Sequence, residues 1–280
     1  LAACTGGDTG GGGLDSGDPG WLGPSTTTWP DDTVDGDDVF IGQSWVCTVT
    51  PNDGDDDGTT ASTSASTFDE VEFTTCSATG ASGPSQSACD SAYAGTDLDG
   101  DVTVTSGIQY WTVPATASYI ITAVGAAGGD NTNHGFIGGY GASMSGTVSL
   151  TAGDVLAIVV GQEGTNGTDD AGGGGGSFVV LSASSAPLMI AGGGGSGGEN
   201  DNNTTYMALY KNGVTGTCGQ DALAHGGGLI SGGCSGLGGS VDAYLYGQGG
   251  GGGFTGNGSG PGAGYSFTNG AAGSSKGGFG

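Results

Sequence analysis

The side chains that could do chemistry are few in this chain of 280 residues, and none stands in a catalytic pattern. The residues around Ser196 fit G-x-S-x-G, the nucleophile-elbow motif, but its strand-to-helix context is missing. His134 and His225 are the only histidines, and neither has a recognisable partner motif for general-base catalysis. We therefore predict that the protein is not an enzyme, with a hydrolase as a distant third hypothesis.

Carboxylates at alternate positions raise the question of a metal. Asp53, Asp55 and Asp57, followed by Gly58, match the first half of an EF-hand-type calcium loop. Ser64 stands where that loop needs its bidentate glutamate. The cluster therefore either binds Ca²⁺ weakly or forms solvated acidic turns, and Ca²⁺ is the one cofactor that the sequence leaves open.

The six cysteines indicate an oxidising compartment outside the cytoplasm. Cys76 and Cys89 bracket a loop of Gly, Ser and Pro, and a disulfide closing such a loop would stabilise the fold by about 3 kcal/mol. Cys218 and Cys234 form a second candidate pair around another glycine-rich loop. No two cysteines have the C-x₂-C spacing of a zinc site.

Leu1-Ala2-Ala3-Cys4 matches the end of a bacterial lipoprotein signal, in which cleavage leaves the cysteine as the lipid-bearing N-terminus. A tether of Gly, Asp and Ser follows it. We expect a lipoprotein anchored at the cell surface through Cys4, and an ordinary free or disulfide-bonded cysteine is the alternative. If Cys4 carries lipid, Cys47 is left without a partner.

Composition excludes several classes of partner. A net charge of −26, with only two basic side chains, would repel nucleic acid and anionic lipid headgroups. No run of apolar residues is long enough for a transmembrane helix, so membrane contact is expected only through the lipid anchor. The 34% apolar fraction suffices for one moderate β core, and long patterns of helical period are missing.

We predict three regions along the chain. Residues 1–39 read as a lipoprotein-type N-terminus with a flexible Gly/Asp/Thr linker. Residues 40–68 contain one alternating strand, and their stretch WVCTVTPNDGDDDG resembles the closing hairpin of Ig-like repeats in large bacterial surface proteins. This part is expected to be a partial hairpin or stalk. Residues 69–280 form the glycine-rich domain.

Apolar stretches in the glycine-rich domain read as antiparallel strands of a sandwich, and they cover residues 108–114, 118–124, 147–150 and 155–160. Two further strands, at 178–181 and 188–191, lie between polyglycine runs. Such runs are either disordered linkers or extended threefold helices of the polyproline II type, packed side by side. Because linkers do not alternate with buried strands, we favour packed helices.

These residues resemble a known family, the extracellular glycine-rich domain of the anaplastic lymphoma kinase and leukocyte tyrosine kinase receptors, which also occurs in bacterial proteins. The resemblance covers nearly all of residues 73–280, and its Cys-to-Cys motif and W-x-V-P-A-T turn are specific. The matching stretches are FTTCSATGASGPSQSACDSAY, GIQYWTVPATASYIITAVGAAGG, LAIVVGQEG, AGGGGGSFVV, PLMIAGGGGSGG and GGGGGFTGNG.

The resemblance implies an all-β jelly-roll sandwich, similar to tumour necrosis factor, with an inserted bundle of polyglycine II helices and almost no α-helix. It also implies a Cys76–Cys89 disulfide and binding of protein cytokines without catalysis. Receptor signalling is not carried over, because a kinase domain and a membrane span are missing here. Related chains usually continue beyond the Gly277 to Gly280 segment, so a C-terminally incomplete domain, or completion by a neighbouring chain, is expected.

Aromatic side chains between glycine segments are the candidate ligand-binding residues. Rigidly presented aromatic tips suit a sugar or a protein surface, and the alternative is that they fill space around the glycine segments. We predict an extracellular adhesion or recognition protein that binds a protein or glycan partner. The alternative function is a structural subunit that binds copies of itself in a filament or surface layer. The candidate residues are Tyr206, Tyr210, Tyr244, Tyr246 and Phe254.

Overall fold

The structure is a computed structural model, and it divides the chain into two compact units that are described separately below. One unit comprises Leu1–Val71 with Pro114–Thr116, and the other comprises Glu72–Val113 with Ala117–Gly280. The described residues are 2–7, 26–27, 44–49, 61–66, 70–133, 135–168, 171–197, 212–223, 229–240, 251–260, 263–273 and 276–280.

The N-terminal unit contains a four-stranded antiparallel sheet with the order β2-β1-β3-β4. Its strands are β1 (Ala2–Gly7), β2 (Thr26–Thr27), β3 (Ser44–Val49) and β4 (Ala61–Ser66). Strand β3 was predicted from its alternation, and β4 pairs antiparallel with it. The partial Ig-like hairpin or stalk stays a prediction. Strands β1 and β2 lie in the part that we read as a flexible linker, because its small residues carry no apolar pattern.

The glycine-rich unit is mostly antiparallel β-sheet, which confirms the all-β prediction. A five-stranded sheet has the order β11-β10-β9-β6-β5, while β7–β8 and β12–β13 form two-stranded sheets. The strands are β5 (Val102–Thr105), β6 (Ile108–Thr112), β7 (Ala117–Val124), β8 (Ser143–Leu150), β9 (Val155–Val159), β10 (Ser177–Leu181), β11 (Ala186–Ala191), β12 (Ala222–Leu223) and β13 (Leu229–Ile230).

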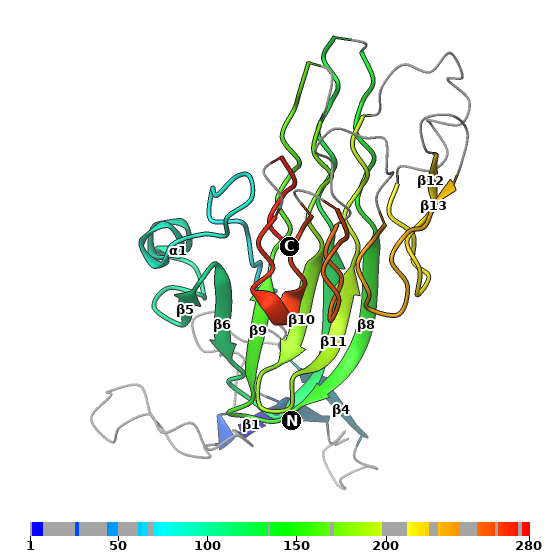
Figure 1. Ribbon diagram of the computed structural model, residues 1–280. Coiled ribbons are helices and arrows are strands. Elements are labelled where there is room, and N and C mark those ends of the chain that lie inside the picture. Colours follow the sequence, from blue (N-terminus) through cyan, green and yellow to red (C-terminus); the bar gives the residue numbers. More distant parts are fainter. Residues whose placement is uncertain are drawn as a thin grey trace, which may run out of the picture. The chain divides into compact units, whose positions relative to one another are not determined.

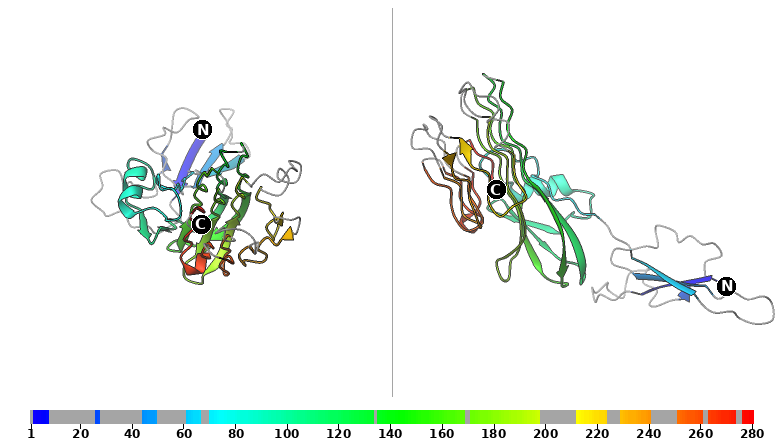
Figure 2. Two further views of the ribbon diagram at one scale, coloured as in Figure 1. Left: turned by 45° about the horizontal axis from the view of Figure 1, so that its top comes forward. Right: turned by 90° about the vertical axis from the view of Figure 1, so that its right-hand side faces the viewer.

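The chain changes layer twice, between β6 and β7 and between β8 and β9, and the unit is therefore a sandwich of two sheets (Figure 1, Figure 2). Strand β6 pairs with β9 in the large sheet, whereas the next strand, β7, pairs with β8. The β7–β8 pair packs against β10 and β11. Burial alternates along β7 and β8, so each has one face toward the large sheet and one toward solvent.

One face of the large sheet is covered by the last part of the chain. Phe178 and Val180 from β10 pack there with Ile108 of β6, and the buried side chains of Ala271 and Phe279 complete the cluster. Phe267, at the start of the 3₁₀ helix η2 (Phe267–Asn269), lies at the edge of this cluster. The glycine-rich C-terminal stretch therefore contributes apolar side chains to the core of the sandwich.

The opposite face carries a buried polar network. The Gln109 side chain is completely buried, and its Nε2 donates a hydrogen bond to the Thr74 carbonyl oxygen at 2.8 Å. Its Oε1 accepts one from the Tyr93 hydroxyl at 2.6 Å, and that hydroxyl accepts one from the Thr74 N–H at 2.9 Å. Phe73 packs edge-on against Tyr93 and Trp111 beside this network.

Helix α1 (Gln86–Tyr93) is the one α-helix of the described residues, in agreement with the expectation of almost no helix. Its N-cap is Ser85, whose side chain accepts a hydrogen bond from the Ala88 N–H at 3.2 Å. No helix was predicted here, although serine is a preferred N-cap residue. The Cys76–Cys89 disulfide and the buried Tyr93 fix the helix to the sandwich.

The buried network predicts that removal of the Tyr93 hydroxyl lowers the stability of the protein. Tyr93→Phe keeps the ring but leaves Gln109 Oε1 without its donor, so we expect the free energy of unfolding to fall by about 1–3 kcal/mol. Urea denaturation of the oxidised protein measures it. The control is Tyr110→Phe, whose hydroxyl makes no hydrogen bond within the described part of the chain. Equal stability of both variants would contradict the role given to the network.

Candidate interaction surface

Five strands of the sandwich continue directly into glycine-rich segments at one end of the sheets (Figure 1). The segments run over residues 125–131 after β7, 136–142 before β8, 161–167 after β9, 171–176 before β10 and 192–197 after β11. They lie beside one another and are joined by backbone hydrogen bonds, so they are not free linkers. The strand pairing below them fixes which segments become neighbours.

Hydrogen bonds between these segments recur at every third residue. The N–H groups of Gly125, Gly128 and Asn131 donate to carbonyl oxygens of segment 136–142. Those of Ala126 and Gly129 donate to segment 171–176 instead. The acceptors are, in the same order, Ala142, Gly139, Phe136, Gly175 and Gly172, at 2.8–2.9 Å. Residues three apart in segment 125–131 therefore face the same neighbour, and adjacent residues face different ones.

The carbonyl groups of segment 125–131 follow the same rule. Those of Ala126 and Gly129 accept hydrogen bonds from Gly194 and Gly197, both at 2.8 Å. Those of Ala127 and Asp130 accept from Gly164 and Gly167, both at 3.0 Å. The segment thus has four hydrogen-bonded neighbours, and little of its backbone polarity is left unpaired.

This arrangement depends on glycine because side chains would occupy the space of neighbouring backbone. A Cβ atom on Gly138 would overlap the carbonyl oxygen of Gly128, and one on Gly141 would overlap that of Gly125. A Cβ on Gly194 would overlap the Gly139 carbonyl. The contacting atoms are backbone atoms of hydrogen-bonded segments, so they cannot move aside independently.

Two large side chains project from this scaffold into solvent. Ile137 is 64% exposed and Tyr140 is 73% exposed. They are three residues apart in a segment with a three-residue period, so they lie on the same side of it. The backbone of Tyr140 is held on both sides, since its N–H donates to Asn212 Oδ1 at 2.9 Å and its carbonyl accepts from Gly213 at 2.7 Å.

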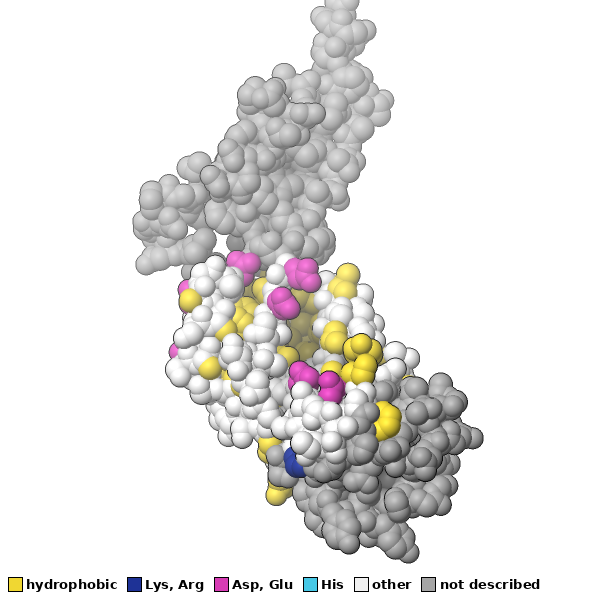
Figure 3. All heavy atoms as spheres, turned by 90° about the horizontal axis from the view of Figure 1, so that it is seen from above, with side chains coloured by type: hydrophobic (Ala, Val, Ile, Leu, Met, Phe, Trp, Pro, Cys, Tyr) yellow, Lys and Arg dark blue, Asp and Glu magenta, His cyan; other side chains and the backbone are white. Residues whose placement is uncertain are grey.

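The space-filling view from above shows where the molecule is hollowed (Figure 3). Apolar side chains line the hollow, and Asp and Glu side chains stand near its rim. Basic side chains are scarce on this face, as the composition of two Lys and Arg against 28 Asp and Glu requires. A partner that approaches this face meets apolar area within a negative field.

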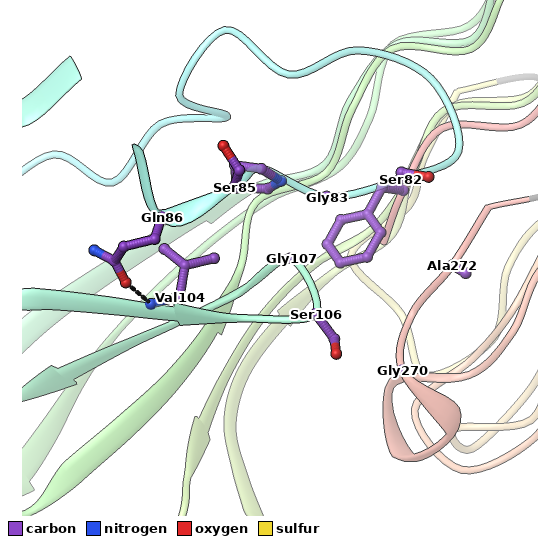
Figure 4. Close-up of a pocket in the computed structure, with 11 residues that line it drawn as sticks. Ser82, Gly83, Ser85, Gln86, Val104, Ser106, Gly107, Gly270 and Ala272 are labelled. Atoms are coloured by element: carbon purple, nitrogen blue, oxygen red, sulfur yellow. Dashed lines mark hydrogen bonds between the residues drawn. The ribbon is translucent and has the colours of Figure 1, made fainter. Parts of the chain in front are cut away.

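A pocket of about 440 Å³ lies between the N-cap of α1, the β5–β6 turn and the η2 region (Figure 4). Gln86 is already engaged there, because its Oε1 accepts from the Val104 N–H at 2.6 Å and its Nε2 donates to the Val102 carbonyl at 2.9 Å. The lining holds hydroxyl, amide and apolar groups without an acid or a base, which suits hydrogen bonding and not proton transfer. The lining residues are Ser82, Gly83, Pro84, Ser85, Gln86, Val104, Ser106, Gly107, Gly270, Ala272 and Phe279.

The structure places only some of the residues named from sequence. Cys76–Cys89 and Cys218–Cys234 are disulfides. The Phe254 ring stacks on Phe267 and Phe178 at the edge of the apolar cluster. The remaining candidates lie outside the described residues, namely Tyr206, Tyr210, Tyr244, Tyr246, Asp53, Asp55, Asp57, His134 and His225.

Catalytic and metal motifs find no counterpart in the described part of the chain. Ser196 lies five residues after the end of β11, in glycine segment 192–197, whose N–H groups at Gly194 and Gly197 bond to segment 125–131. A nucleophile elbow places its serine on the sharp turn directly after a strand, so this G-x-S-x-G match is not one. Among the described residues, His, Cys, Asp and Glu side chains nowhere gather in groups of three that could hold a metal ion. No described helix is both long and apolar enough for a membrane span.

Ile137 and Tyr140 were missed from sequence, although a signal existed. In FIGGYG they are apolar residues at a spacing of three among glycines. A threefold segment puts such residues on one side. Without knowledge of which side faces its neighbours, that spacing does not distinguish an exposed pair from a buried one.

Comparison with known proteins gives a partial match to a receptor. Over 95 residues, a third of this chain (33%), the sequence is 40% identical to the leukocyte tyrosine kinase receptor of Mus musculus. The match spans 11% of that receptor's length. No protein-family model matches the chain. The resemblance seen in the sequence is thus confirmed for a part of the chain, whereas the bacterial lipoprotein type is not shown.

The close packing of glycine segments predicts that an added methyl group destabilises the protein at Gly194 but not at Gly192. We expect Gly194→Ala to lower the free energy of unfolding by about 1–3 kcal/mol or to prevent folding, because its Cβ overlaps the Gly139 carbonyl. Gly192→Ala is the matched control, since a Cβ there meets nothing within 4 Å. It should change stability by less than about 1 kcal/mol. Thermal unfolding compares the two, and equal destabilisation would refute the packing argument.

Proposed function

We propose that this protein is a non-catalytic extracellular recognition domain that binds a protein or glycan partner. The observation that carries the proposal is the pair Ile137 and Tyr140, exposed on one side of a hydrogen-bonded glycine segment. Exposed apolar residues on a rigid scaffold are typical of interaction sites. The partial identity to a receptor supports recognition over catalysis.

We infer further that the glycine segments are polyglycine II helices inserted in a jelly-roll sandwich. Polyproline II geometry has three residues per turn and no internal hydrogen bonds, so its polar groups must pair with neighbours. The three-residue period of the contacts between segments supports this geometry. Glycine at the contact positions supports it too, because only a residue without Cβ lets backbones approach so closely.

An extracellular location agrees with the two disulfides and with the similarity to a receptor. Presentation at a cell surface is part of the proposal. The means of attachment is not part of it, because the side chains of β1 are not among those described, and the predicted lipid at Cys4 competes for its sulfur with the disulfide proposed below.

The net charge of the chain indicates what charge the partner's contact surface should carry. With a net charge of −26, association is fastest with a partner whose contact surface is basic. A neutral glycan would depend on the aromatic ring of Tyr140 and on hydrogen bonds, and its binding would be insensitive to salt. Salt dependence therefore separates the two partner classes.

The proposed surface predicts the loss of binding in one double variant. We would screen the immobilised chain against a panel of secreted proteins, basic and neutral, and against an oligosaccharide array. For a specific hit, Ile137→Ser with Tyr140→Ser should weaken affinity at least about tenfold, because exposed apolar anchors dominate such interfaces. Surface plasmon resonance at two salt concentrations measures the affinity.

Leu237→Ser is the matched control, since Leu237 is 60% exposed but lies in a different segment. It should bind like the wild type, and all variants should keep the wild-type unfolding midpoint. A hit that the double variant retains would remove this surface from the proposal. Binding to neither panel would contradict the recognition function itself.

A second candidate function is a structural subunit that joins copies of itself. Strands β7 and β8 pair only with each other among the described strands, so each has an edge without a strand partner. The β8 sequence, SMSGTVSL, has no charge, no proline and no bulge to protect that edge. Ile120 is 78% exposed on the outer face of β7, opposite Thr147.

Self-assembly through this edge predicts a concentration-dependent mass. Light scattering coupled to size exclusion, with electron microscopy of the same fractions, should then show filaments or large oligomers. Thr147→Lys should abolish them, because a charge on an edge strand opposes strand addition. A discrete monomer across the concentration range would exclude the structural function and leave the recognition function untouched.

A further inference from the structure

The geometry points to a third disulfide, between Cys4 and Cys47, which closes the N-terminal sheet covalently. Strands β1 and β3 pair in antiparallel register over six residue pairs, and Cys4 stands directly opposite Cys47. In the order β2-β1-β3-β4, these are the two central strands. We propose that this bond, and not a lipid anchor, uses the Cys4 sulfur.

The register of β1 and β3 brings Cys4 and Cys47 close enough for a disulfide. Directly opposite residues of an antiparallel pair have Cα atoms about 4.5 or 5.5 Å apart. Disulfides bridge Cα separations of about 4.4–6.8 Å, so no movement of the strands is needed. A shift of the pairing by one residue would destroy this coincidence, because the opposite positions would then be Thr48 or Val46.

The same chain already contains a disulfide of this kind. Cys218 and Cys234 are partners in an isolated antiparallel bridge, and they are joined by a disulfide. Of the six cysteines in the sequence, four are thus paired in Cys76–Cys89 and Cys218–Cys234. The two that remain are Cys4 and Cys47, the two that the β1–β3 register places opposite each other.

Cleavage before Cys4 would change β1 and its pairing with β3. The strand begins at Ala2, and Ala2 and Ala3 pair with Val49 and Thr48. Lipoprotein processing would remove both residues and shorten the ladder by two of its six pairs. Acylation would also convert the Cys4 thiol to a thioether, which cannot form a disulfide, so the two fates exclude each other.

Formation of the bond needs an external oxidant, and a small-molecule or protein disulfide of an oxidising compartment supplies it. The thiolate of one cysteine attacks the external disulfide, forms a mixed disulfide and releases one thiol. The second thiolate then attacks the mixed disulfide and releases the other thiol. Cys4 and Cys47 together lose two electrons and two protons, and the oxidant is reduced to two thiols.

Disulfide mapping of the full chain tests the proposal. The protein is secreted into an oxidising compartment, denatured without reductant, and treated with iodoacetamide before intact-mass measurement. We expect no alkylated cysteine and a mass six hydrogens below that of the reduced chain. Because trypsin has only Lys211 and Lys276 to cut at, peptic digestion at acid pH, which also suppresses exchange, should yield a linked peptide with Cys4 and Cys47.

Variants and an internal control make the outcome decisive. Cys76–Cys89 is the control, and a preparation counts only if that bond is present. Cys4→Ser should expose one alkylatable thiol at Cys47, whereas Cys4→Ser with Cys47→Ser should expose none. Two free thiols in the wild type, an acyl group on Cys4, or a bond from Cys4 to any other cysteine would each overturn the proposal.

Discussion

The approach of one bare backbone to another is the constraint on which the glycine-rich unit depends. At contact positions such as Gly138 and Gly164 no volume remains for a Cβ atom, because it would overlap the carbonyl oxygen of Gly128 or Gly172 in the neighbouring segment. Disorder is the usual fate of glycine runs, because glycine loses the most conformational entropy on folding. Here each residue gains backbone hydrogen bonds instead of side-chain contacts.

The sandwich offsets part of that entropy cost, because its paired strands fix where each glycine segment begins or ends. Val124 ends β7 and Gly125 begins a glycine segment, and Gly176 ends another directly before β10. Strand pairing thus sets the spacing and the register of the segments. Phe279 links the two regions in the other direction, because its ring is buried in the core while its carbonyl accepts a hydrogen bond from Gln162 at 2.9 Å.

Sequence reasoning succeeded where a pattern has one physical meaning. Period-two alternation located β3, and short apolar runs located β9, β10 and β11 to within two residues. It did not find β1 or β2, because Ala, Thr and Gly carry no apolar signal and β1 is specified by pairing with β3. Phe254 and Tyr140 are both aromatic residues among glycines, yet one packs on Phe178 and the other is exposed.

Rigidity explains why such a scaffold would serve recognition. A binding residue on a flexible loop must lose about 1–2 kcal/mol of backbone entropy when it is ordered by a partner. Tyr140 has a backbone that is already held by Asn212 and Gly213, so only its side chain remains to be fixed, at about 0.5–1.5 kcal/mol. Ile137 precedes the buried Gly138, and its segment 136–142 is hydrogen-bonded to segment 125–131. The glycine segments do not contact the partner in this view, but they hold Ile137 and Tyr140 in place and so lower the entropy cost of binding.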